Sequence, residues 1–96
     1  MIGYRLLPPA EEEMTEAALF YETANAGLGD DFLDDMQHAI NAAQRNPEHG
    51  AKIGFGLRRI LVRRFPFSIV YAIEPEQVVV VAAHQRRRPR YWKGRI

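Results

Sequence analysis

Residues 57–85 read LRRILVRRFPFSIVYAIEPEQVVVVAAHQ, and this stretch decides the fold class. Its first part is aliphatic and β-branched with arginines in pairs, and Pro66 interrupts it. Residues 67–73 alternate so that their large apolar side chains share one face of a strand. Residues 78–83 are apolar without interruption, as expected of a central strand with both faces covered. Residues 74–77 form a turn with proline at its second position, so the stretch predicts three strands joined as a meander.

The residues before this stretch predict one more strand and two helices. Residues 2–6 alternate in polarity up to two prolines, which indicates a brief strand that the prolines stop. Small and apolar side chains then recur at three- and four-residue steps over residues 10–24, the pattern of an amphipathic helix with an alanine-rich face. A second helix is expected over about residues 30–45, and Asn46-Pro47 ends it. Residues 49–56, with three glycines and no clear period, predict a loop.

Together these elements predict one α+β domain over residues 1–96, in the order β-α-α-β-β-β. We expect a mostly antiparallel four-stranded sheet with a helical hairpin packed on one face, because nothing else in the chain is large enough to cover it. The opposite face of the sheet is then partly open. Most of the arginines belong to the strands and the C-terminal residues that build this open face.

Charge is divided unequally along the chain. Through Glu48 there are ten carboxylates and two arginines, a net charge of −8, whereas the remainder has two carboxylates and eleven cations, a net charge of +9. Such asymmetry indicates an anionic partner for the basic half. The alternative is that the two halves neutralise each other in the fold. We expect the acids of the helical turn to lie farther from the cations than a Debye length of about 8 Å, which argues against this alternative.

Composition also excludes several kinds of site. The chain has no cysteine, which excludes disulfides and thiolate metal sites and fits a reducing cytosol. The longest apolar run, residues 78–83, is far shorter than the roughly 20 residues of a membrane span. Glutamates at 11–13 precede any signal-peptide core, so we expect a mature, cytoplasmic protein with no membrane partner. His38 and His49 have no ligand cluster around them, and we therefore expect neither a metal nor a cofactor.

Two groups of cations could bind an anionic target. Each arginine pair of the stretch at 58–64 should place one guanidinium on the open face, where it could grip phosphates; alternatively, the charges protect an edge strand from aggregation. The C-terminal group combines cations with Tyr91 and Trp92, as single-strand nucleic-acid sites do. We expect Trp92 to pack on the sheet and the arginines to meet an acidic partner. The predicted basic surface consists of Arg58, Arg59, Arg63, Arg64, Arg86, Arg87, Arg88 and Arg90.

His84 is the candidate for acid–base chemistry, because it ends the last strand and imidazole titrates near neutral pH. A lone histidine more often has a structural role, and we expect that role here.

Several features of the chain occur together in one known family. They are the arginine-rich strand, the aromatic step Phe65-Pro66-Phe67, Ile69 and Tyr71, and an ending with His84, Arg86-Arg87-Arg88-Pro89 and Trp92. The first half has a strand, a helix from Ala10-Glu11 to Tyr21, Phe32 in the second helix, and Asn46-Pro47 at its end. In these features the chain resembles the RelE/ParE superfamily, the toxins of type II toxin–antitoxin modules.

The resemblance implies the RelE/ParE toxin fold and a growth-inhibiting toxin that a cognate, ParD-like antitoxin holds inactive. Antitoxins of this family lay an extended or helical arm along the toxin's helices and sheet. The residues expected to contact such an arm are Met14, Ala17, Tyr21, Phe32 and Met36.

The family contains two activities. RelE-like members cut messenger RNA on the ribosome, and ParE-like members bind DNA gyrase and trap its cleaved complex. The lysine-rich set of RelE is absent, so we expect a ParE-like gyrase poison and assign no catalytic residue. The alternative, a ribosome-dependent mRNA endoribonuclease, would use His84, Arg64, Arg86 and Tyr91. A third hypothesis is a basic binding domain without toxicity.

Overall fold

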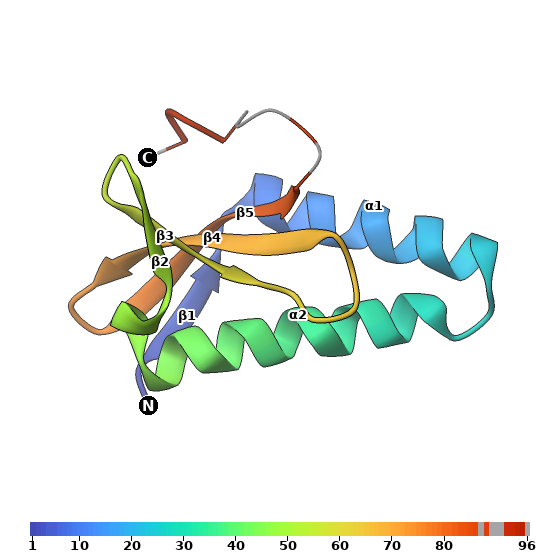
Figure 1. The fold of residues 1–96 in the computed structure, drawn as a ribbon, viewed down its shortest axis with the longest axis horizontal. Helices are drawn as coiled ribbons and strands as arrows, with labels where there is room; N and C mark the ends of the chain where they lie inside the picture. Colours follow the sequence, from blue (N-terminus) through green and yellow to red (C-terminus); the bar gives the residue numbers. More distant parts are fainter. Residues whose placement is uncertain (87, 89–91, 96) are drawn as a thin grey trace.

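The fold is a mixed five-stranded sheet with two helices on one face (Figure 1). The computed structural model describes residues 1–86, 88 and 92–95. The strands lie in the order β1-β5-β4-β3-β2, with β1 parallel to β5 and the other neighbours antiparallel. Along the chain the elements are β1 (Gly3–Leu6), α1 (Pro8–Ala24), α2 (Leu28–Arg45), the short 3-10 helix η1 (Pro47–His49), β2 (Ala51–Gly54), β3 (Leu57–Leu61), β4 (Phe67–Glu74) and β5 (Gln77–Gln85).

The predicted fold class, the helical hairpin and the β3-β4-β5 meander are confirmed. The expectation of four strands and of a loop over residues 49–56 was wrong, because β2 forms within that segment and pairs with β3 as a fifth strand. A tight hairpin turn requires positive φ at its central residues, and Gly56 has φ of 72° there, whereas Gly54, with φ of 87°, ends β2 beside a register irregularity. The four-residue β2 owes its order to pairing with β3, and its own sequence is too short to show a period.

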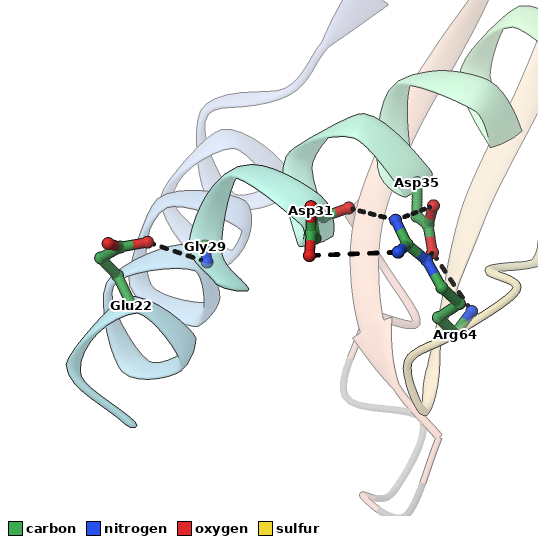
Figure 2. Close-up of polar contacts among 5 residues, drawn as sticks. All are labelled: Glu22, Gly29, Asp31, Asp35 and Arg64. Atoms are coloured by element: carbon green, nitrogen blue, oxygen red, sulfur yellow. Dashed lines mark hydrogen bonds and ion pairs between the residues drawn. The ribbon is translucent and has the colours of Figure 1, made fainter. Parts of the chain in front are cut away.

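The two helices approach each other closely. A Cβ atom at Gly29 would lie 2.6 Å from the carbonyl oxygen of Ala18, so the helices can approach this closely because position 29 is a glycine. The Glu22 carboxylate in α1 accepts a hydrogen bond of 3.0 Å from the Gly29 N–H (Figure 2). It accepts a second one, of 2.9 Å, from the Gly27 N–H. Glu22 thereby caps α2, whose own N-cap is a glycine without a side chain.

An aromatic cluster joins the helices to the sheet. Phe65 in the β3–β4 connection and Phe67 at the start of β4 flank Pro66. Their rings pack on Phe32 of α2 with centroids 5.3 and 4.9 Å away. Tyr21 of α1 lies 4.7 Å from the Phe65 ring. The aromatic step seen in the sequence therefore anchors the β3–β4 connection against both helices.

The other face of the sheet is partly covered by the C-terminal segment. Trp92 is 1% exposed and packs with β-strand side chains that include Val70, Val79 and Val81. The expected packing of Trp92 is confirmed. Residues 78–83 are buried on both faces, as predicted, in a strand that lies between β1 and β4. Within the described part of the chain, neither helix has the length and apolar character that crossing a bilayer demands.

Candidate functional site

Four arginines of the predicted basic surface point into solvent. Arg59, Arg63, Arg86 and Arg88 are exposed, and none of their side chains makes an ion pair or hydrogen bond within the described residues. The Arg86 N–H donates to the Pro66 carbonyl at 2.9 Å, which holds the end of β5 against the β3–β4 connection. That connection contains Arg63, so cations from two separate stretches of sequence gather at this end of the sheet.

Arg64 does not belong to the free cations. Its Nε and Nη2 donate to the two oxygens of Asp35 at 2.9 and 3.0 Å, and its backbone N–H donates to the same carboxylate (Figure 2). A second, longer ion pair joins Arg64 to Asp31 at 4.0 Å. These hydrogen bonds hold the pKa of Asp35 below its usual value, although burial of the carboxyl acts the other way.

The expectation that the arginines lie apart from the acidic hairpin was therefore wrong for Arg64. The observed strand β3 ends at Leu61, so Arg63 and Arg64 lie in the connection beyond it. Strand alternation does not govern that connection, and it turns Arg64 toward α2. The two halves of the chain neutralise each other at this point, while other cations stay unneutralised.

Arg58 and Arg59 confirm the alternation expected within β3. Arg59 pairs with Val70 and shares the face that the helices leave open, whereas Arg58 points to the other side. Arg58 Nη1 donates to the carbonyls of Glu48 and Gly50 at 2.9 and 2.8 Å, so it fastens η1 to the sheet. Because β2 covers β3, the paired arginines do not protect an exposed sheet edge.

An ion pair between Arg95 and Glu13 fixes the C-terminal segment to α1. Arg95 Nη1 lies 3.0 Å from Glu13 Oε1, and both side chains are 20% exposed. The same guanidinium donates to the Val81 carbonyl at 2.8 Å, and Glu13 accepts a hydrogen bond from the Ala83 N–H at 3.2 Å. Since β1 ends at Leu6, this ion pair supplies partners to the edge of β5 that β1 leaves uncovered.

Glu13, Asp35 and Arg95 were not among the predicted site residues. Glu13 and Asp35 each lie in a run of acids on a helix, and only the tertiary contact distinguishes them from their neighbours. Sequence spacing carries no signal for contacts 29 or 82 residues apart.

His84 is buried at 8% exposure and packs edge-on against Trp92, with ring centroids 5.9 Å apart. Its Nε2 lies 3.1 Å from the carbonyl oxygen of Arg88, which can only accept, so this nitrogen carries the proton. The imidazole thus holds the C-terminal segment to the end of β5. Of the remaining predicted residues, Arg87, Arg90 and Tyr91 lie outside the described part of the chain. No group of carboxylates and histidines suited to a metal ion occurs in the part that is described.

Comparison with known proteins identifies the family. The model of the family described as "ParE toxin of type II toxin-antitoxin system, parDE" matches residues 4–89. The chain belongs to the ParE toxin family. It is also similar in structure to a chain of the chromosomal ParDE TA system from P. aeruginosa, with a TM-score of 0.69, 16% sequence identity, and coverage of 85% of this chain and 92% of that chain. No curated protein matches the sequence.

This ParE-family toxin has an open cleft beside α1, with a volume of about 500 Å³. Glu16, Ala17 and Phe20 of α1 form one side, and the end of β5 with Arg88 and Arg95 forms the other. Of the residues expected to touch an antitoxin, Ala17 and Tyr21 line this cleft and are partly exposed, and Met14 is partly exposed elsewhere on α1. Phe32 and Met36 are fully buried in the core. A partner could therefore reach only the first three.

Proposed function

We propose that this ParE-family toxin arrests growth by binding DNA gyrase and trapping its cleaved DNA complex. The observation that carries the proposal is the state of His84, which is buried and holds Arg88 through its Nε2. A general acid or base must come within hydrogen-bond reach of the proton that it transfers. Arg64, a second member of the ribonuclease set, is bound to Asp35. Both contacts favour action by binding over RNA hydrolysis.

The exposed cations give the toxin a surface that suits an anionic target. Arg59, Arg63, Arg86 and Arg88 could meet acidic side chains of gyrase or phosphates of the DNA that gyrase holds. The proposal places this activity in the cytoplasm, where gyrase and chromosomal DNA are found.

We infer that a ParD-type antitoxin neutralises the toxin by occupying the cleft along α1. Phe20, which lines the cleft, is 68% exposed, and its neighbour Leu19 on α1 is 63% exposed, an unusual extent for large apolar side chains. Two glutamates and two arginines line the same cleft, so an arm with both apolar and charged side chains would suit it. Met14, Ala17 and Tyr21 remain the residues proposed to contact this arm.

The test combines purified gyrase with the purified toxin and supercoiled plasmid, followed by denaturation of the protein. We expect linear plasmid to accumulate with the wild-type toxin. The triple variant Arg59→Gln, Arg63→Gln, Arg86→Gln should lose about tenfold or more in potency, because it removes three cations proposed to contact the anionic target. It should still fold, because no described contact within the toxin uses these side chains. Arg45→Gln, which removes an exposed arginine at the far end of α2, is the matched control and should match the wild type.

Expression in cells gives the second readout. Induction of the toxin alone should arrest growth with filamentation, and co-expression of the antitoxin should restore growth. Cleavage of messages in a translating extract, with gyrase unaffected, would contradict the proposal and establish the ribonuclease. Unaffected growth together with unaffected gyrase would leave a basic binding domain.

A further inference from the structure

We propose that the tip of the β2–β3 hairpin contacts nucleic acid directly, with Phe55 stacked on an exposed base and nearby cations on the phosphates. The first observation is the geometry of the turn. Gly54 pairs with Leu57, so Phe55 and Gly56 form a two-residue turn in which φ is 57° and 72°. A type I′ turn requires positive φ at both central residues, and Asn-Gly is the favoured sequence for it. Phe55 is the sole non-glycine residue with positive φ within the described ranges.

A bulky aromatic residue is a poor choice for this turn, and the fold gains little from it. The Phe55 side chain is 66% exposed and belongs to neither apolar core cluster. A local conflict of this kind, without compensation by burial, points to selection for function at the position. The described contact of the ring is with the Lys93 ammonium, 5.3 Å from its centroid, which adds a cation at the tip.

The surroundings of Phe55 identify the chemistry of its partner. The chain has no carboxylate from His49 through Ile73, and Lys52 of β2 and Arg59 of β3 are both exposed on the hairpin. An exposed ring in contact with one ammonium group, on a hairpin that carries further cations, combines base stacking with phosphate binding, the arrangement found where proteins hold unstacked bases. An apolar pocket on a protein partner fits less well, because closing it over the ring would also desolvate these cations.

Direct binding tests the inference without gyrase, so its outcome is independent of the proposed target. The full-length toxin is titrated against a short fluorescein-labelled single-stranded DNA while anisotropy is measured. Phe55→Asn should weaken binding about 5- to 150-fold, the range that loss of one stacked base implies. Its unfolding midpoint in urea should equal or exceed that of the wild type, because Asn-Gly suits the turn. Phe55→Tyr should bind as the wild type does.

Two further variants separate the explanations. Phe20→Ala removes an aromatic side chain of matched exposure, 68%, from the acidic helix α1 and should leave DNA binding unchanged. Lys93→Gln should weaken binding less than Phe55→Asn and reduce its salt dependence. If Lys93→Gln weakened DNA binding as much as Phe55→Asn does, the ring would act only by holding Lys93 and the C-terminal segment in place. That result would overturn the inference. Absence of DNA binding by the wild type, or full binding by Phe55→Asn, would also overturn it.

Discussion

Asp35 illustrates at the residue scale how this fold uses charge. Its carboxylate is 6% exposed and receives hydrogen bonds from both the backbone and the guanidinium of Arg64. The contact ties the connection after β3 to α2 across 29 positions of sequence. A buried carboxylate without such partners would cost far more than an exposed one, so Asp35 and Arg64 depend on each other. Arg64 therefore stabilises the fold, whereas its neighbour Arg63 stays available to a partner.

Asp35→Ala is expected to lower the free energy of unfolding by about 1–2 kcal/mol, since it removes charge-assisted hydrogen bonds while water can still reach Arg64. Asp34→Ala, an exposed neighbour on the same helix, is the control and should change little. Because folding lowers the pKa of Asp35 from its ordinary 3.8, the contribution is complete above that pH. It should disappear as the pH falls through the lower, folded pKa. Urea unfolding at a series of pH values measures this, and a difference between wild type and Asp35→Ala that persists unchanged in strong acid would contradict it.

At the scale of elements, strongly patterned segments were predictable and segments that depend on tertiary contact were not. The helices and β4 carry their own period, so their existence and order followed from the sequence. The strand β2 has four residues between glycines, and only its pairing with β3 orders it. The contact of Arg64 with the acidic hairpin was missed for the same reason, because β3 ends at Leu61 and tertiary contacts order the connection beyond it. Of the candidate site, the exposed cations were predictable and the contacts of Glu13 and Asp35 were not.

The approach of α1 and α2 leads to a prediction about Gly29. Glycine to alanine usually stabilises a helix by up to about 1 kcal/mol, but here the new Cβ would lie 2.6 Å from the Ala18 carbonyl oxygen. The Ala18 carbonyl belongs to the backbone of α1 and cannot rotate away as a flexible side chain can. The steric cost should therefore exceed the gain in helix propensity. Gly29→Ala is expected to lose about 1–3 kcal/mol of unfolding free energy. The control is Gly3→Ala, where a Cβ meets its nearest atom at an ordinary 3.8 Å. Thermal unfolding followed by circular dichroism compares the two, and equal midpoints would show that the helices can separate without cost.

At the scale of the whole molecule, the C-terminal segment links the two faces of the sheet. Trp92 covers the face that the helices leave open, and Arg95 reaches Glu13 on α1. Arg86 and Arg88 lie between β5 and these anchors, so the anchors determine where the exposed cations are held. Closure of the small core and presentation of the basic surface therefore depend on the same few contacts.

Trp92 is the single tryptophan of the chain, and its fluorescence can report whether the segment is docked. Glu13→Ala removes the partner of Arg95 and of the Ala83 N–H, so we expect a loss of about 1–3 kcal/mol in unfolding free energy. The native emission maximum should also move to longer wavelength as Trp92 meets water, with the far-ultraviolet circular dichroism unchanged. Glu16→Ala, one turn along α1 and exposed, should leave the emission at the wild-type position. If Glu13→Ala kept both the wild-type emission and the wild-type stability, the ion pair could not be what holds the C-terminal segment, and burial of Trp92 with the hydrogen bonds of His84 to Arg88 and of Arg86 to Pro66 would have to position these arginines.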